Sequence, residues 1–211
     1  IAVEIEGTDY RNSWDVWVYP DRVSLRGARQ VMITEQLDAD ALRALREGQS
    51  VLLTPGLDNI VSDVPPGFTT IFWNTQWTNG QPPHTLGILC NPAHPALSSF
   101  PTEFHSNWQW WDLVRHSKPM VLDEFPGELD PIVQVIDDWN LNRKLGLIFE
   151  GTIGEGKLLV CGIDLKTGLD QRPVARQMLR SLLDYMAGSE FEPEMELQID
   201  TLDGLLKRRP W

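Results

Sequence analysis

The feature that most constrains the fold of this chain is a long apolar hairpin pattern followed at once by an amphipathic helix. Residues 143–165 have the sequence RKLGLIFEGTIGEGKLLVCGIDL, two aliphatic arms around a Gly-Glu-Gly tip. Aliphatic arms joined by a short glycine-rich connection are typical of a β-hairpin. From Pro173 to Met186 apolar residues recur at helical spacing, and Gly188 follows. This pattern predicts a helix that begins at proline and ends at glycine.

An earlier segment alternates strand, helix and strand. RQVMIT indicates a short buried strand, residues 38–47 a helix, and SVLLTPG a second strand. Asp38 is the expected N-cap, Leu42 and Leu45 are the inward positions, and Gly48 ends the helix. A strand, a crossover helix and a second strand form a βαβ unit with a parallel strand pair.

Further apolar segments complete the predicted sheet. TLGILC, KPMVLD and PIVQVID are strand candidates, and NWQWWDLVRHS is a candidate short helix. Residues 56–85 are too long and irregular for a simple connection and are expected to form a packed insertion. The fold class predicted is therefore α/β, an open and mostly parallel sheet flanked by helices.

The first twenty residues follow a different rule. IAVEIEGTDYRNSWDVWVYP alternates apolar and polar residues on either side of a turn region, which predicts a β-hairpin. A hairpin alone is marginal in water, so we interpret it as the last strands of a preceding β-sandwich. The predicted organisation is a terminal hairpin or linker over 1–22, an α/β domain over 23–190 and a C-terminal tail over 191–211 with one short surface helix.

Composition narrows the function classes. The chain has 30 acidic against 18 basic residues and a net charge of -12, which argues against nucleic-acid binding. The sequence contains neither an apolar run of membrane-spanning length nor a signal-peptide pattern, so no membrane association is expected. Nine Trp outnumber seven Phe and three Tyr. This excess of the largest aromatic residue requires an explanation.

The polar chemistry offers few catalytic candidates. Cys90 and Cys161 lie in apolar stretches and are expected to be inert core thiols. Asn91 and Pro92 follow Cys90 where a nucleophile elbow requires glycine. The histidines show no metal-ligand spacing, and GTIGEGK lacks the ending of a phosphate-binding loop, so neither a metal nor a cofactor is predicted.

Carboxylates occur in adjacent pairs that do not suit glycoside hydrolysis. Neighbouring residues of a strand point to opposite faces, so neither Asp123-Glu124 nor Asp137-Asp138 supplies two carboxyl groups across one sugar. Asp138 beside Trp139 either caps a loop or contacts a polar ligand.

The tryptophans lead to two alternatives. Indole faces stack on sugar rings, and the same side chains also favour cores and protein interfaces. The candidate carbohydrate-binding or interface residues are Trp73, Trp77, His84, His105, Trp108, Trp110, Trp111, Asp138 and Trp139. In the sugar-binding alternative, Trp73, Trp77, Trp110 and Trp139 line a groove with Asp138, His84 or His105 as polar contacts.

A family resemblance covers almost the whole chain. The stretches NSWDVWVYP, VLLTPG, FWNTQWTNGQPPHTLGILCNPAHPALSSFPTEFHSNWQWWDLV, PIVQVIDDW, GKLLVCGIDL and RPVARQMLRSLLDYM resemble the C-terminal region of bacterial glycoside hydrolase family 2 proteins, the β-galactosidase-like enzymes. In that family the catalytic glutamates belong to an upstream barrel. The resemblance implies a non-catalytic accessory domain that braces neighbouring domains or a homo-oligomer, in a parent expected to be periplasmic or secreted.

The α/β part also resembles, more distantly, the class I glutamine amidotransferase-like domain, which is flavodoxin-like in its general architecture. The resemblance depends on the order strand, helix, GQSVLLTPG strand, and on the IGEGKLLVCGIDL hairpin before a helix. The Gly-x-Cys-x-Gly elbow of active amidotransferases is missing, and Cys90 lies in LCNPAH. Two alternatives stay open, a carbohydrate-binding module and a small hydrolase that uses Cys90 or the Glu103 and His105 pair.

Overall fold

A computed structural model of the chain describes residues 1–25, 29–68 and 85–207. A seven-stranded mixed sheet forms the centre, with strand order β3-β4-β9-β8-β7-β5 and β6 paired with β8. Its strands are β3 (Val31–Thr34), β4 (Ser50–Leu53), β5 (Gly87–Cys90), β6 (Met120–Val121), β7 (Val133–Ile136), β8 (Leu145–Ile153) and β9 (Gly156–Cys161). The α/β fold class is thereby confirmed.

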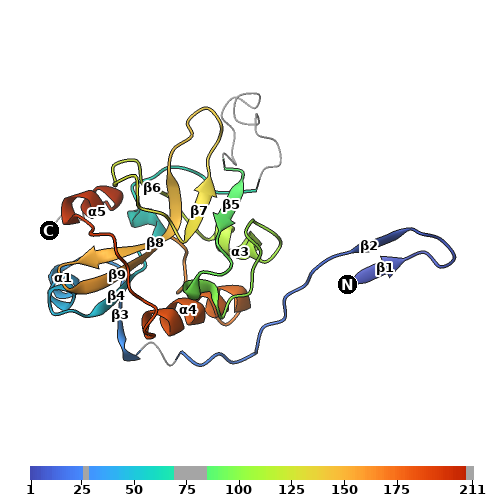
Figure 1. Cartoon of the computed structure of the whole chain (residues 1–211), viewed down its shortest axis with the longest axis horizontal. Helices are drawn as coiled ribbons and strands as arrows, with labels where there is room; N and C mark the ends of the chain where they lie inside the picture. Colours follow the sequence, from blue (N-terminus) through green and yellow to red (C-terminus); the bar gives the residue numbers. More distant parts are fainter. Residues whose placement is uncertain (26–28, 69–84, 208–211) are drawn as a thin grey trace.

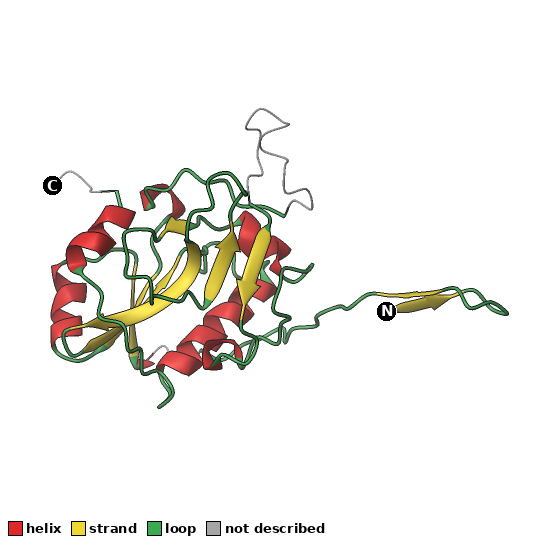
Figure 2. Cartoon of the chain, turned by 45° about the horizontal axis from the view of Figure 1, so that its top comes forward, coloured by secondary structure: helices red, strands yellow, loops and turns green. Residues whose placement is uncertain are grey.

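Helices cover both faces of this sheet (Figure 2). They are α1 (Ala39–Arg46), α3 (Trp110–Arg115), α4 (Pro173–Met186) and α5 (Ile199–Leu205), with short 3-10 turns η2 (Leu57–Asn59) and η3 (Pro95–Leu97). One core lies between the sheet and α3 with α4, and includes Leu113 and Leu182. The second lies between the sheet and α1 with α5, and includes Leu45 and Leu202.

Strand residues divide between the two cores by simple alternation. Leu52 of β4 packs in the core under α4, whereas its neighbours Val51 and Leu53 pack in the core under α1. A strand buried on both faces needs apolar residues at every position, which explains the continuous VLL run. The sequence therefore encodes a central strand here.

The βαβ unit has the predicted local structure. Asp38 accepts hydrogen bonds from the backbone N–H groups of Asp40 and Ala41, so it is the N-cap of α1. Gly48 follows the helix with a φ of +79°, a conformation that favours glycine. β3 and β4 are parallel, as the sequence predicts.

The prediction of a mostly parallel sheet is wrong. Among the strands of the described residues, the β3–β4 and β4–β9 pairs are parallel, whereas β9–β8, β8–β7, β7–β5 and β6–β8 are antiparallel. Parallel neighbours need a crossover of a dozen or more residues, but Gly154 and Glu155 alone join β8 to β9. The tight connection that identifies this hairpin therefore also fixes an antiparallel half of the sheet.

The C-terminal residues pack on the same body. The predicted short helix is α5, and its Leu202 and Leu205 are buried against the sheet. Leu197 donates its backbone N–H to the carbonyl of Thr152 in β8. Of the helices in the described ranges, none combines the length and apolar character that crossing a membrane requires.

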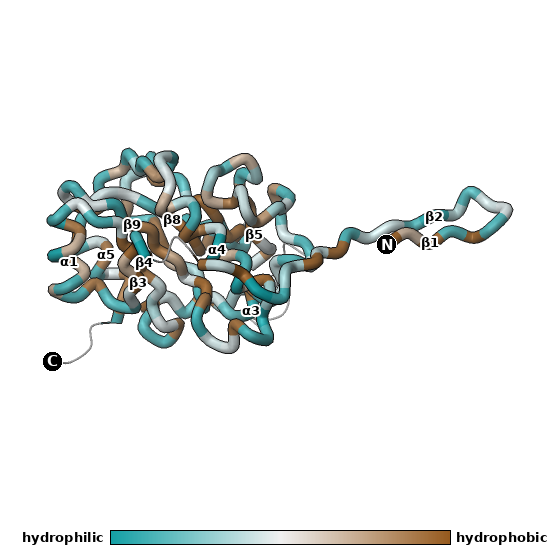
Figure 3. Tube along the Cα trace, turned by 90° about the horizontal axis from the view of Figure 1, so that it is seen from below, coloured by the Kyte–Doolittle hydropathy of each residue, from teal (hydrophilic) through white to brown (hydrophobic). Residues whose placement is uncertain are grey.

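The first residues form a separate hairpin, β1 (Ala2–Glu4) and β2 (Arg11–Ser13), joined to the body by an extended segment. The hairpin extends away from the body (Figure 1), and every residue of both strands is exposed. Apolar residues gather in the central strands of the body, whereas they alternate with polar ones along this arm (Figure 3). Val16 and Val18, which the alternation places in the second strand, lie outside it.

Candidate functional site

Both cysteines are protonated thiols at neutral pH. Burial raises the pKa of Cys90 to about 11, and its Sγ donates a hydrogen bond to the Glu103 carbonyl. Cys161 is fully buried, and burial raises its pKa to about 12. A nucleophilic cysteine needs a lowered pKa, so neither environment supports thiolate catalysis.

His94 and His105 form hydrogen bonds with nearby backbone groups. His94 accepts a hydrogen bond from the backbone N–H of Ala96, and burial lowers the pKa of its ring. His105 shares a ring hydrogen bond with the Ser106 carbonyl, while the carboxylate of Glu103 accepts from Asn107. Glu103 and His105 therefore bond to different partners. The described residues contain no group of three or more His, Cys, Asp or Glu that could hold a metal ion.

The Asp137–Asp138 pair organises the turn between β7 and β8. Asp138 accepts backbone hydrogen bonds from Asn140 and Leu141, which confirms the loop-capping alternative. Asp137 receives two side-chain hydrogen bonds from Arg143, at 2.8 Å from Nε and 3.1 Å from Nη2. Burial favours a higher pKa for Asp137, but the hydrogen bonds from Arg143 lower it below its ordinary value.

The three clustered tryptophans divide between core and surface. Trp110 is fully buried and donates its indole N–H to Thr102 at 2.8 Å, so it cannot line a sugar-binding groove. That expectation is corrected, because the first turn of α3 directs residue 110 into the core beneath the surface. Trp108 and Trp111 are exposed, and Trp139 is exposed on the β7–β8 turn. Trp73, Trp77 and His84 lie outside the described residues.

Trp108 and Trp111, here called the indole pair, belong to a small aromatic surface. Their ring centroids are 6.1 Å apart, and Phe68 lies 5.8 Å from Trp111. The Arg115 guanidinium lies over the Trp111 ring, 5.2 Å from its centroid. Sequence reasoning missed Phe68 and Arg115. The spacing of four residues between Trp111 and Arg115 was an available signal for the second.

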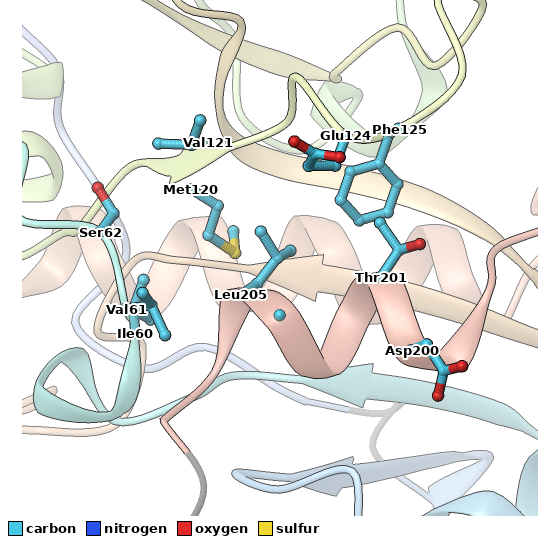
Figure 4. Close-up of a pocket in the computed structure, with 11 residues that line it drawn as sticks. Ile60, Val61, Ser62, Met120, Val121, Glu124, Phe125, Asp200, Thr201 and Leu205 are labelled. Atoms are coloured by element: carbon cyan, nitrogen blue, oxygen red, sulfur yellow. The ribbon is translucent and has the colours of Figure 1, made fainter.

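Surface hollows occur at several places on the described part of the chain. A pocket of about 470 Å³ lies between α5, β6 and the segment after η2 (Figure 4). Its wall is mainly apolar, with Glu124 and Asp200 as its carboxylates. A second pocket, of about 590 Å³, lies at the carboxyl ends of β3 and β4, where the Glu35–Lys166 ion pair joins two loops.

A third hollow, of about 360 Å³, lies where the arm meets the body. Tyr19 stacks on Phe100 with ring centroids 6.5 Å apart, and its hydroxyl accepts a hydrogen bond from Gln109 at 2.6 Å. Arg176 of α4 donates to the Pro20 carbonyl. These contacts attach the base of the arm to the body.

The hairpin of the arm is amphipathic. Ile1 and Trp14 exchange two backbone hydrogen bonds, and Ile5 donates to the Tyr10 carbonyl, so the strand register continues beyond the paired residues. Side chains of directly opposed residues share a face. One face therefore carries Ile1, Val3, Ile5, Tyr10 and Trp14 together with Asn12, and the other carries Ala2, Glu4, Arg11 and Ser13.

These observations define an α/β domain with a mixed sheet between two helical layers and an amphipathic hairpin on an extended arm. The model of one family, described as a domain of unknown function (DUF8487), matches residues 32–207. This match spans most of the chain, and the chain therefore belongs to that family. Among curated proteins, none matches the chain.

Proposed function

We propose that this chain is a non-catalytic accessory domain of a β-galactosidase-like glycoside hydrolase, in which it braces a neighbouring domain. The exposed apolar face of the hairpin is the observation that carries this proposal. Ile1, Ile5 and Tyr10 are 71%, 61% and 74% exposed on one side of a two-stranded ribbon. Soluble proteins seldom leave such a face uncovered without an interaction to cover it.

A neighbouring β-sheet is the partner that suits this hairpin best. An isolated two-stranded hairpin is marginal in water, and its outer strand edges present unpaired backbone groups. A sheet that adds these strands satisfies the backbone groups, and a facing sheet covers the side chains of Val3 and Trp14. Both conditions are met in a β-sandwich, the kind of domain that the hairpin pattern leads us to expect before this arm.

The body supports an accessory role in a different way. Cys90 ends β5, an edge strand of the sheet, and its thiol has a raised pKa and a carbonyl partner. The parallel β3–α1–β4 unit and the β8–β9 hairpin before α4 favour an amidotransferase-like, flavodoxin-like ancestry for the sheet. We infer a scaffold that keeps this architecture without its catalysis.

An activity assay tests the non-catalytic part of the proposal. The purified 211-residue chain is incubated with aryl β-galactosides, and the expected result is no turnover above the uncatalysed rate. Measurable turnover that copurifies with the chain would overturn the proposal. Alkylation with iodoacetamide at pH 8 provides a second readout. Native Cys90 should react about 100-fold more slowly than in the unfolded chain, because less thiolate is present.

The bracing proposal predicts that the encoded protein continues before Ile1, and it is tested on that longer protein. The residues before Ile1 are expected to form a β-sandwich that covers Val3 and Ile5. The double substitution Val3→Thr and Ile5→Thr should then lower the melting temperature of the longer protein. Glu4→Gln on the polar face is the matched control and should leave it unchanged. Equal melting temperatures for all three proteins would contradict the proposal.

A further inference from the structure

We propose that the indole pair, Trp108 and Trp111, is a binding site for neutral oligosaccharides. This site goes beyond the bracing role and is argued from its own geometry. Trp108 is 75% exposed and Trp111 is 44% exposed. Most of the Trp108 indole is therefore open to the apolar face of a ligand, whereas Trp111 offers the part of its ring that Arg115 and Phe68 leave uncovered.

The rings present a bent surface to a ligand. The planes of Trp108 and Trp111 are inclined by 57°, and Phe68 extends the surface beyond Trp111 at the same inclination. Rings inclined in this way do not stack on one another. Neither indole of the pair therefore covers the whole face of the other. The rings can contact two successive sugar units of a chain that itself turns at each glycosidic bond.

Polar side chains lie beside the rings. Arg115 is held over Trp111, and Asn107, which precedes Trp108, donates to Glu103 at 2.8 Å. A pyranose has an apolar C–H face and a rim of hydroxyl groups that both donate and accept hydrogen bonds. The site offers an apolar platform, guanidinium donors and carboxylate acceptors, the combination that orients such a ligand. The net charge of -12 disfavours an anionic glycan.

The backbone that carries the indole pair is fixed from below. Between the two exposed indoles lie Gln109 and Trp110, which are 4% and 0% exposed. Gln109 donates to both the Tyr19 hydroxyl and the Pro101 carbonyl, and Trp110 donates to Thr102. A platform that is already ordered loses little conformational entropy when it binds.

Titration calorimetry with neutral probes tests the proposal. The probes are β-1,4-galactotriose, xylohexaose and cellohexaose, each titrated into the full 211-residue chain. The expected result is saturable binding of at least one probe. Trp108→Ala and Trp111→Ala should each weaken that binding about tenfold or more, the equivalent of losing one stacking contact.

Trp14→Ala is the matched control, because Trp14 is 47% exposed and lies in the arm, outside the body. It should leave the affinity unchanged. Glu103→Gln keeps both rings and should weaken binding less than the ring substitutions do. Thermal melts check that each variant is folded, which we expect because both rings of the pair are at the surface.

Three outcomes would overturn the proposal. The first is the lack of saturable heat for all three probes. The second is an equal loss of affinity in Trp14→Ala and Trp108→Ala. The third is a change in molar mass by light scattering in Trp108→Ala without any effect on sugar binding, which would assign the rings to a protein interface. If the indole pair does not bind sugar, the activity assay and the hairpin test of the proposed function remain valid, because they do not depend on it.

Discussion

The hairpin arm and the central sheet share the geometry of β-strands and differ in what surrounds them. In both, side chains point alternately to the two faces of the strand, but apolar residues alternate with polar ones in the arm and fill nearly every position of central strands such as β4. Ile5 in the arm is nevertheless 61% exposed, whereas Ile148 in β8 is fully buried. The comparison teaches that alternation specifies a strand and its two faces, while the partner that covers those faces lies elsewhere in the sequence or in another domain.

The largest expected difference between the two regions comes from truncating their isoleucines. Ile148→Ala should lower the free energy of unfolding by about 4 kcal/mol, since it removes methyl groups from a closed core. Ile5→Ala should change it by less than about 0.5 kcal/mol, as for other surface substitutions. Urea unfolding followed by tryptophan fluorescence measures both. Similar losses would show that the arm is part of the cooperative unit.

Glycine substitutions compare how the body and the arm tolerate an added Cβ. A Cβ at Gly156 would lie 2.3 Å from the Leu45 carbonyl oxygen, at the place where α1 crosses the start of β9. We expect Gly156→Ala to cost about 3 kcal/mol, because the displaced neighbour is helix backbone. Gly7 in the arm has open space around it and a φ of +76°. Gly7→Ala should strain only the hairpin turn, so the unfolding midpoint of the body stays unchanged.

Removing a carboxylate charge should give a smaller and pH-dependent difference in stability between the body and the arm. Asp137→Asn breaks the paired hydrogen bonds with Arg143 and should cost about 2 kcal/mol at pH 7. The folded-state pKa of Asp137 is lowered, so this stabilisation is present above the unfolded pKa of about 3.9 and is lost as pH falls through the folded value. The gap between wild type and variant should therefore narrow under acid conditions.

Glu4→Gln in the exposed arm is the control for this experiment, since a surface charge pair contributes little. Urea unfolding at several pH values between 3 and 7 compares the three proteins. A gap for Asp137→Asn that stays constant over this range would show that the carboxylate charge is not what stabilises the turn.

The smallest expected effect is a gain in the free energy of unfolding. Gly204 lies on the exposed side of α5, and a Cβ there meets nothing within 4 Å. Gly204→Ala should raise the free energy of unfolding by about 0.7 kcal/mol, because alanine has the higher helix propensity. A gain measured in urea would confirm that α5 unfolds with the body. An unchanged midpoint would place α5 outside the cooperative unit, as we expect for the arm.

Local patterns predict most elements of this fold but not their assembly. The N-cap at Asp38, the turn at Gly154 and the helix from Pro173 follow from short-range chemistry, and the structure has all three. The prediction of a mostly parallel sheet is wrong because the relative direction of two strands depends on which distant segments pair with each other. A βαβ unit in the sequence shows one parallel pair and contains no information about the remaining strands.

The candidate site shows the same limit. The cluster from Trp108 to Trp111 stands out in the sequence, but composition does not reveal that Gln109 and Trp110 are buried while their neighbours are exposed. Phe68 is separated from Trp111 by more than forty residues, so its contact with that ring depends on the assembled fold. The capping role of Asp138 is easier to predict from sequence, because it involves residues only two and three positions away.

The pairing of β4 with β9 has a consequence for how the chain folds. Ser50 of β4 meets Lys157 of β9, which is made about a hundred residues later. During synthesis the β3–α1–β4 unit must therefore wait, with one strand edge open, until most of the chain has emerged. The late β8–β9 hairpin joins the early parallel unit to the antiparallel half. Its appearance should set the moment at which the sheet becomes stable.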